Sequence, residues 1–483
     1  MLDVRPWQIN PVLLLILVVL LLPGCERVSS RDGLSRAQQL EAERQYGAAI
    51  VELKSLLQQE PNNGEARLLL GKTYFDIEDY ASARKELHRA RSLGITDDVS
   101  VPLLARALIF QNEPDEVLML ETPGTLLPGP GAELNATKAL AYLAVNQKEK
   151  TKIYIDKALQ VMPDSNWVRF AHARILIEEN SQTKAIPILE KLLQEDPSDG
   201  IAWSLLGNTY LTFGKLAEAE NAYTQAIANR IKKSADYLRR GITRLKQGKL
   251  DTAAGDAEIL LKLNPKWIEA RYFAGKVKFR QRRFTEAERI LEDTYYLNVN
   301  HFQVVFLLAR TYLALNKLER AEALAENAYH LKPKLPVTRN LLVEIYLRQN
   351  KGEKSEELLR PILATYPGNL STTMALASSL VQQYKNAEAE ALLLHALQSD
   401  PSNLEARVAL AHFYLSRNET KRVIDLLQGW DVKRAQKILE RVIEKSPNSA
   451  KAHYGLARIN MILGNPREAD NLFRKALELE SQK

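Results

Sequence analysis

One property of this sequence restricts its fold more than any other: residue types recur every 34 positions. The recurrence is clearest for seven prolines whose separations are all multiples of 34, at Pro61, Pro163, Pro197, Pro265, Pro333, Pro367 and Pro401. Proline has no backbone N–H and ends helices, so each of these residues marks the end of a helical segment. A strict short period predicts one elongated array of helical hairpins, in place of several separate globular domains.

The stretch Gly200–Lys233 carries the period most clearly. Its apolar residues stand at i, i+3, i+4 and i+7 on a first helix, Gly214 interrupts the chain, and a second helix follows. The residues expected to pack this hairpin are Trp203, Leu206, Gly207, Tyr210, Ala219, Tyr223 and Ala226. Their offsets resemble the tetratricopeptide signature, W-x2-L-G-x2-Y followed by A-x3-F and A. The resemblance implies an all-α fold, a right-handed tetratricopeptide α-solenoid of about 12 to 13 hairpins.

A second position supports the same register over eleven repeats, from residue 30 to residue 403. The position equivalent to Gly207 is Gly or Ala in ten of the eleven repeats: Ala37, Gly71, Ala105, Ala139, Ala173, Gly207, Gly241, Gly275, Ala309 and Ala377, with Val343 as the exception. A small residue at this position lets the two helices of a hairpin approach closely. The periodic array is therefore assigned to residues 34–403.

Composition is that of an ordinary folded protein. The chain is 46 % hydrophobic and 26 % charged, and it has no Gly/Ser-rich or Pro-rich segment that could act as a long linker. The net charge of +7 permits weak attraction to anionic partners but is modest for this length, so nucleic-acid binding is not expected. With a single cysteine, Cys25, the chain cannot form an intramolecular disulfide bond.

The N-terminus has the pattern of an export signal. Residues 12–22 are a continuous apolar run of eleven residues, too short to span a membrane as a helix without help from its flanks. The sequence Leu22-Pro23-Gly24-Cys25 follows, which resembles a bacterial lipobox. The resemblance implies a lipoprotein signal peptide at residues 1–24 and diacylglycerol on the sulfur of Cys25. The alternative is an uncleaved membrane anchor with an incidental cysteine.

Residues 25–33 are then expected to form a short lipidated tether. More than one acyl chain gives stable membrane attachment, because each buried methylene contributes roughly 0.8 kcal/mol. In lipoproteins of this kind an aspartate after the cysteine signals retention at the inner membrane. Glu26 stands there instead. The resemblance thus implies the periplasmic face of the bacterial outer membrane, or the cell membrane if the protein is retained.

The first repeats carry a further resemblance. The segment from Ala49 to Gly71 resembles the start of the tetratricopeptide lipoproteins associated with PEP-CTERM/exosortase gene clusters and exopolysaccharide production. The matching residues are Ala49, Ile50, Glu52, Leu53, Lys54, Leu57, Gln58, Pro61, Ala66, Arg67, Leu70 and Gly71. This resemblance implies protein partners in an exopolysaccharide synthesis or export machine, or in the associated sorting system.

Two segments depart from the period. The third repeat, residues 98–131, is degenerate: residues 121–133 hold three prolines and three glycines, which predicts a shortened second helix and an irregular loop. After Pro401 the spacing fails, so residues 404–449 are expected to be an irregular helical segment. The pattern returns in residues 450–483, a last tetratricopeptide repeat with a polar end that caps the array.

No arrangement of residues points to an enzyme, a metal site or a cofactor. The seven histidines are scattered singly, and none forms H-E-x-x-H or pairs with the cysteine. There is no phosphate-binding loop and no nucleophile elbow. A glycosyltransferase with a helical-repeat regulatory part is disfavoured because no catalytic domain follows the repeats. Function is therefore expected to reside in surfaces.

The first helix of each hairpin lines the concave side of such arrays. Projecting those helices inward between residues 268 and 369 gives a strip in which basic and aromatic side chains alternate. The predicted partner groove consists of Tyr272, Lys276, Phe279, Arg280, Phe306, Arg310, Asn340, Glu344 and Arg348. Such a strip suits an acidic, partly apolar peptide or an anionic polysaccharide stacked on rings. Inter-repeat packing and solvated charge are the alternative interpretation.

Three functions remain open from the sequence. The leading one is a non-enzymatic periplasmic scaffold lipoprotein that joins proteins of an exopolysaccharide or PEP-CTERM sorting machine. The second is direct binding of an anionic polysaccharide, with the array as a conduit for the polymer. The third is a general outer-membrane assembly or pilus-type tetratricopeptide lipoprotein.

Overall fold

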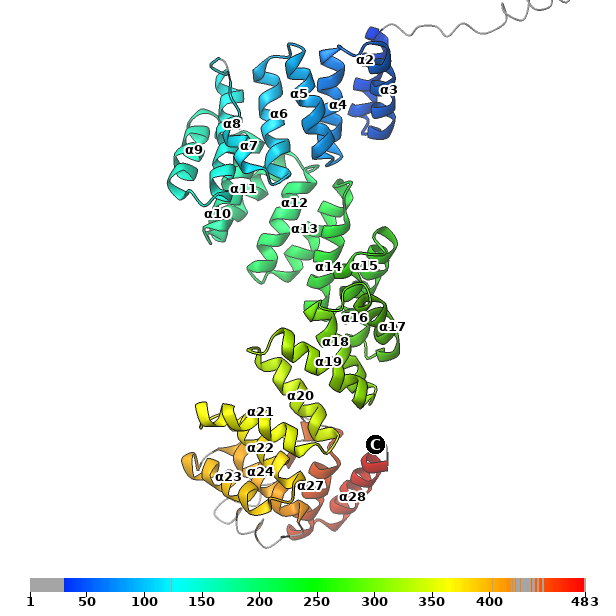
Figure 1. Cartoon of the computed structure of the whole chain (residues 1–483), viewed down its shortest axis with the longest axis vertical. Coiled ribbons are helices and arrows are strands. Elements are labelled where there is room, and N and C mark those ends of the chain that lie inside the picture. The colour runs from blue at the N-terminus through cyan, green and yellow to red at the C-terminus, as the bar shows by residue number, and fades with distance from the viewer. Residues whose placement is uncertain are drawn as a thin grey trace, which may run out of the picture. The chain divides into compact units, whose positions relative to one another are not determined.

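The fold is seen in a computed structural model of the whole chain (Figure 1). The structure describes residues 30–122, 124–401, 403–417, 419 and 447–481, with a few single positions between 422 and 444. The signal segment 1–24, Cys25 and most of the tether 25–33 lie outside the described residues, as does most of segment 404–449 beyond residue 417. Within the described residues every regular element is a helix.

The helices form antiparallel hairpins, each with a first helix A and a second helix B. The A helices are α2 (Ser30–Ala42), α4 (Gly64–Asp76), α6 (Asp97–Phe110), α8 (Pro128–Ala144), α10 (Asn166–Glu178), α12 (Gly200–Thr212), α14 (Ser234–Lys246), α16 (Ile268–Arg280), α18 (Phe302–Ala314), α20 (Pro336–Arg348), α22 (Leu370–Gln382), α24 (Leu404–Ser416) and α27 (Ala450–Ile462). The B helices are α3 (Tyr46–Gln59), α5 (Tyr80–Ser92), α7 (Pro114–Leu118), α9 (Lys148–Val161), α11 (Gln182–Glu195), α13 (Leu216–Asn229), α15 (Leu250–Leu263), α17 (Phe284–Tyr295), α19 (Leu318–Leu331), α21 (Gly352–Thr365), α23 (Asn386–Ser399) and α28 (Pro466–Ser481). The predicted all-α solenoid of hairpins is confirmed.

The chain divides into two compact bodies. The N-terminal body ends at Ala270 and the C-terminal body begins at Arg271. Within each body consecutive helices pack on one another along the chain, as in the runs α4·α5·α6 and α18·α19·α20. Among the described residues, none of the helices combines the length and the hydropathy that a membrane-spanning segment needs.

Each hairpin turns at a residue in the left-handed conformation. A positive φ recurs at this position every 34 residues, at Arg44, Glu78, Asn112, Asn146, Asn180, Gly214, Gly248, Arg282, Asn316, Asn350 and Tyr384. Two residues after each of them a B helix begins. The next backbone N–H bonds back to helix A, for example from Lys215 to the carbonyl of Tyr210 at 2.9 Å, which closes the end of that helix. Gly and Asn suit this conformation; Arg, Glu and Tyr adopt it at a cost.

Close contact between A and B helices explains the small residues of the period. A Cβ atom on Gly207 would lie 2.8 Å from Cε1 of Tyr223, whose side chain is fully buried. Leu206, Ala219 and Ala226 are buried beside it, and Tyr210 is 8 % exposed. Trp203 is only partly buried, and its indole N–H donates to the carbonyl of Pro197 at 2.9 Å.

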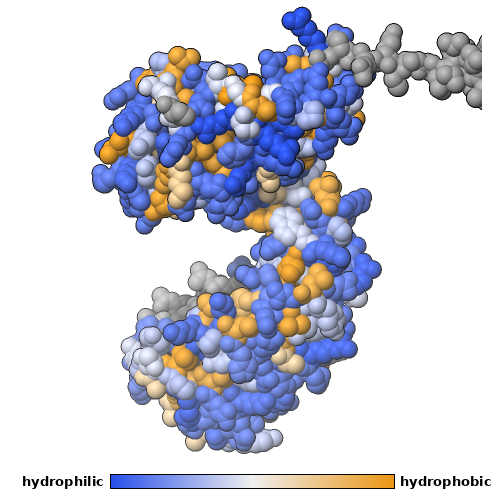
Figure 2. Space-filling model, turned by 45° about the horizontal axis from the view of Figure 1, so that its top comes forward, coloured by the Kyte–Doolittle hydropathy of each residue, from blue (hydrophilic) through white to orange (hydrophobic). Residues whose placement is uncertain are grey.

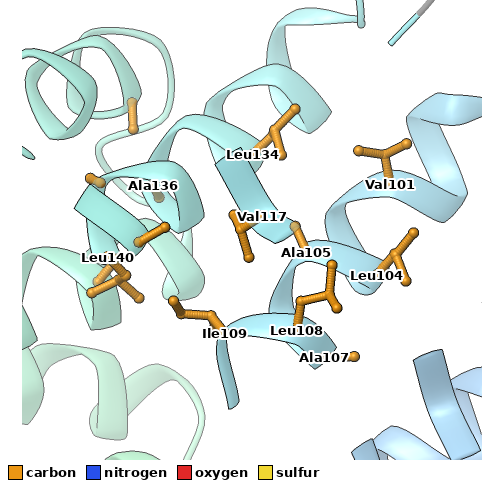
Figure 3. Packing of buried hydrophobic residues seen from close by; sticks show 14 of the residues in the cluster. Val101, Leu104, Ala105, Ala107, Leu108, Ile109, Val117, Leu134, Ala136 and Leu140 are labelled. Atoms are coloured by element: carbon orange, nitrogen blue, oxygen red, sulfur yellow. The ribbon is translucent and has the colours of Figure 1, made fainter. Parts of the chain in front are cut away.

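The degenerate third repeat keeps the stack continuous. Its B helix, α7, has five residues, yet Val117 on this helix is fully buried between α6 and α8 (Figure 3). Leu104 and Leu108 of α6 belong to the same apolar cluster, as does Leu140 of α8. Helix α8 begins at Pro128, inside the segment 121–133 where an irregular loop was expected, because proline is well suited to the first turn of a helix.

Neighbouring repeats are also joined by polar contacts that recur with the period. The tyrosine of the signature donates to a glutamate of the preceding B helix, as from Tyr346 to Glu326 at 2.9 Å and from Tyr312 to Glu292 at 2.5 Å. A second series joins a lysine to a glutamate 29 residues earlier, in the pairs Lys249–Glu220, Lys317–Glu288, Lys351–Glu322 and Lys385–Glu356. These contacts supplement the apolar core in setting one hairpin against the next.

Candidate partner-binding site

Three A helices of the C-terminal body, α16, α18 and α20, carry the residues of the predicted groove. The structure gathers four of its side chains at α16 and α18. The ammonium nitrogen of Lys276 lies 5.8 Å from the ring centroid of Tyr272, and the guanidinium of Arg310 lies 5.0 Å from the ring of Phe279. Burial raises the pKa of the Tyr272 hydroxyl, and the nearby charge of Arg310 partly opposes this shift.

Phe306 belongs to a second aromatic pair on α18. Its ring stacks on that of Phe302 at a centroid distance of 5.9 Å. Both rings are partly buried, whereas Arg310 is exposed one turn further on. The two helices thus present rings held in place by packing and cations that reach solvent. This arrangement can stack on an apolar or sugar ring and pair with an anion.

The remaining predicted groove residues are exposed. Arg280 ends α16, and Asn340 and Arg348 lie on α20. Arg348 forms a surface pair with Glu344 at 3.1 Å on its own helix, so part of its charge is already neutralised. The centre of the candidate groove is therefore Tyr272, Lys276, Phe279 and Arg310.

The N-terminal body holds a pocket that the sequence did not reveal. Its volume is about 360 Å³, and it is lined by the end of α4, by α6, by the start of α10 and by the connection from α11 to α12. Four rings form one wall: Phe75, Phe110, Trp167 and Phe170. Trp167 stacks on Phe170 at 5.4 Å, and Phe110 meets Trp167 at 5.8 Å in an edge-on arrangement.

A buried guanidinium borders this aromatic wall. Arg106 lies 4.6 Å from the ring of Trp167 and pairs with Glu133 at 2.7 Å. Its Nε–H has no hydrogen-bond partner among the described residues. Burial lowers the pKa of the Arg106 guanidinium, and Glu133 opposes that shift. The pocket therefore offers rings and one spare hydrogen-bond donor, which suits a flat group that carries an acceptor.

Two carboxyl groups of the pocket are desolvated. Burial, followed by a hydrogen bond with Glu41, raises the pKa of Asp76 to about 7. Burial also raises the pKa of Asp199, although that side chain caps α12 by accepting from the backbone N–H of Ala202 at 2.8 Å. Near neutral pH the charge of the pocket thus depends on Asp76.

A long-range contact, which we call the clasp, closes the pocket on one side. Arg230, which follows α13, donates from Nε to Glu78 at 2.9 Å and pairs with Asp236 at 2.9 Å through Nη1. Lys232 donates to the backbone carbonyl of Glu78. Only 7 % of the Glu78 side chain and 16 % of the Arg230 side chain are exposed. The clasp joins the second repeat to the sixth, 152 residues further along the chain.

The sequence does contain traces of the clasp. Ile231 occupies the position at which seven other repeats have a proline, and Glu78 occupies a left-handed position where Asn or Gly is commoner. Gly200 is also required, because a Cβ atom there would lie 2.5 Å from Cγ of Arg230. Each of these departures from the repeat pattern is weak evidence by itself. Only the folded chain shows that the residues concerned lie together.

No cation site accompanies these surfaces in the described part of the chain. There, no three His, Cys, Asp or Glu side chains gather in a way that could hold a metal ion. The pocket and the groove therefore consist of rings, guanidinium or ammonium groups, and carboxylates.

Comparison with known families agrees with this architecture. The family model described as tetratricopeptide repeat matches residues 40–93, 176–235, 312–377, 380–431 and 426–482, which is more than half of the chain. The chain belongs to the tetratricopeptide-repeat family. A model described as anaphase-promoting complex, cyclosome, subunit 3 also matches this tetratricopeptide-repeat protein, at residues 246–328. No curated protein matches it.

Several solved structures share the tetratricopeptide fold. PilF of Pseudomonas aeruginosa is 17 % identical, with 45 % of this chain and 99 % of PilF covered and a TM-score of 0.40. The C-terminal part of a tetratricopeptide protein from Cytophaga hutchinsonii is 18 % identical, with 50 % and 99 % covered and a TM-score of 0.42. A chain of the Cut9–Hcn1 hetero-tetramer is 14 % identical, with 94 % and 95 % covered and a TM-score of 0.39.

Proposed function

We propose that this tetratricopeptide-repeat protein is a non-enzymatic scaffold lipoprotein of the periplasm, held at the outer membrane by acylated Cys25. Proteins of this family generally mediate protein–protein contacts, which supports the scaffold role. The lipobox-like sequence before Cys25 and the resemblance of the first repeats support a place in an exopolysaccharide machine or its PEP-CTERM sorting system.

The observation that carries the scaffold role is the groove in the C-terminal body. Tyr272 and Phe279 are held by packing, and Lys276 and Arg310 lie over their rings. This arrangement fits an extended peptide that combines acidic and apolar side chains. Charge complementarity on such a surface mainly affects association and salt dependence, since a single exposed ion pair contributes only about 0–1 kcal/mol.

A triple variant tests the groove. Replacing Lys276, Arg280 and Arg310 with alanine should leave the helical content unchanged and weaken capture of partners from detergent-solubilised membranes, most strongly at low salt. The matched control removes three exposed cations from B helices of the same body: Arg289, Arg320 and Lys354. If the groove variant retains every partner at the same salt resistance as the control, the groove assignment is wrong.

The alternative function is direct binding of an anionic polysaccharide. The observation that favours it is the combination of partly exposed rings at Tyr272 and Phe306 with adjacent cations, because sugar rings stack on aromatic side chains. Purified polymer should then bind to the full chain without any protein partner, and the triple variant should lose this binding. That result would favour polysaccharide binding over the scaffold role.

The membrane anchor is tested separately. Cys25→Ala should abolish incorporation of a radioactive fatty acid into the protein. Undiminished label in that variant would exclude acylation at Cys25.

A further inference from the structure

The connections from B helices to A helices form one edge of the C-terminal body. Successive A helices lie side by side, α18 against α20 and α20 against α22, so the starts of these helices are neighbours. The connections that precede them are residues 296–301, 332–335 and 366–369. Neighbouring helices pack about 8–10 Å apart, so three adjacent connections span roughly 20 Å. We call this surface the lower edge.

Large apolar side chains project into solvent along the lower edge. The exposed fraction is 79 % for Tyr296, 48 % for Leu297, 40 % for Leu335, 53 % for Val337 and 63 % for Tyr366. Such residues come from all three connections or from the first turn of the following helix. Figure 2 shows that apolar side chains reach the molecular surface at separate places among mostly hydrophilic ones. Side chains that stand on loop tips cannot enclose a narrow ligand, but they can all enter a broad, soft surface.

The lower edge also lacks carboxylates. No Asp or Glu occurs in residues 294–318, 327–343 or 358–387, whereas Lys332 and Lys334 are exposed. The first turns of α18, α20 and α22 contain no acidic residue. In the N-terminal body each equivalent connection carries Asp or Glu, either within it or in the first turn of the next helix. Acid-free connections with exposed apolar side chains are thus a property of these three repeats, and the middle connection adds Lys332 and Lys334.

We propose that the lower edge docks on an anionic lipid surface. Tyrosine, leucine and valine side chains enter the boundary between headgroups and acyl chains, where an apolar ring and a polar hydroxyl are both accommodated. Lysines near the surface are attracted to anionic headgroups, and the absence of carboxylates from the three connections limits the repulsion that would oppose this contact. The nearby exposed carboxylate, Asp293 in the last turn of α17, is paired with Arg271 at 3.8 Å. The inference does not depend on acylation of Cys25, because the lower edge is built from residues 296–369.

Hydrogen exchange of the full chain on vesicles tests the proposal. With phosphatidylglycerol vesicles, amides of the three connections should exchange several-fold more slowly than in detergent, and the protection should weaken with phosphatidylcholine or with added salt. The turns at Asn316, Asn350 and Tyr384 connect the opposite ends of these helices, so they should show no such change. They serve as an internal reference in the same molecule.

A four-site variant separates the lower edge from any other attachment to the vesicle. Tyr296→Ser, Lys332→Gln, Lys334→Gln and Leu335→Ser together should abolish the protection at all three connections, while exchange in the helices stays unchanged. The matched control changes four exposed residues of the N-terminal body: Met119→Ser, Leu127→Ser, Lys148→Gln and Lys184→Gln. It should behave like the unmodified chain.

Two results would overturn the proposal. One is that the connections exchange equally fast on phosphatidylglycerol vesicles and in detergent. The other is that protection appears only when a purified protein partner is added and is independent of lipid composition, which would make the lower edge a protein interface. Loss of fatty-acid labelling in Cys25→Ala bears on the anchor alone, so failure of the proposed function and failure of this inference are distinguishable.

Discussion

At the scale of single residues, two glycines have opposite roles. Gly207 faces Tyr223, and a Cβ atom there would lie 2.8 Å from the ring, whereas a Cβ atom on Gly255 of α15 would meet nothing within 4 Å. Gly207→Ala should therefore lower the free energy of unfolding by about 1–3 kcal/mol through overpacking. Gly255→Ala should raise it by about 0.5–1 kcal/mol, because alanine favours a helix interior. Urea unfolding of both variants measures the sign of the change in the free energy of unfolding. Equal changes in the two variants would contradict the packing argument.

A second residue-scale prediction concerns the left-handed turn at Tyr384. This side chain is 89 % exposed at φ 61°, in a conformation that asparagine adopts more readily. Tyr384→Asn should stabilise the hairpin of α22 and α23 by about 0.5–1 kcal/mol, measured by hydrogen exchange in those helices. The control is Tyr366→Asn, another exposed tyrosine but with φ −130°. Stabilisation by both substitutions would show that removal of the ring, and not the backbone, is responsible.

Asp76 makes stability depend on pH. Its folded-state pKa of about 7 exceeds that of an unfolded aspartate, so the folded chain keeps a proton that the unfolded chain releases. Stability should fall as pH rises from about 4 to about 7. Asp76→Asn should be more stable than the unmodified chain above that range, by at least about 1 kcal/mol, and equal to it below. Urea unfolding midpoints of both proteins, measured across this pH range, test the sign of this effect. If the midpoints of Asp76→Asn and of the unmodified chain change with pH in the same way, Asp76 is not responsible for the pH dependence.

At the scale of elements, the clasp fixes the distance between the α4–α5 turn and the start of α14. Glu78→Gln leaves Arg230 with Asp236 as its charged partner and Ser204 as a hydrogen-bond acceptor. The substitution should therefore lower the free energy of unfolding by about 1–3 kcal/mol, less than when a buried charge loses every partner. Exchange should accelerate at residues 78–80 and 229–236. Arg348 and Glu344 form an exposed pair, in which the equivalent substitution Glu344→Gln should lower the free energy of unfolding by about 0.5 kcal/mol or less. Equal effects would mean that the clasp is only a surface contact.

The elements also show how far the sequence can be interpreted. The period predicts the hairpins because Gly214 and the Asn residues at the turns act locally, within one repeat. It also places Tyr272 and Arg310 on neighbouring A helices, since those positions follow from the register alone. The clasp could not be predicted, because Glu78 and Arg230 are 152 residues apart and their meeting depends on the summed twist of four hairpins. The same holds for the pocket walls Phe75 and Trp167.

At the scale of the whole molecule, each hairpin contacts mainly its neighbours along the chain. Stability in such an array is approximately a sum of repeat and interface contributions, and unfolding need not be all-or-none. The effect of Gly207→Ala should therefore be confined to the N-terminal body. Hydrogen exchange in α18 and α20 should be unchanged by this variant. Equal acceleration in both bodies would show that the chain unfolds as one cooperative unit.

The clasp has a consequence for how this chain can change in length. A 34-residue block can in principle be duplicated or lost anywhere in a periodic array, because every hairpin reproduces the start of the one before it. Between Glu78 and Arg230 that freedom disappears: one block more or fewer would rotate and displace the two side chains relative to each other, and the ion pair could not form. The clasp can thus form only when the number of repeats between Glu78 and Arg230 is the one found in this chain. Variation in repeat number among relatives that keep both residues should fall outside this interval.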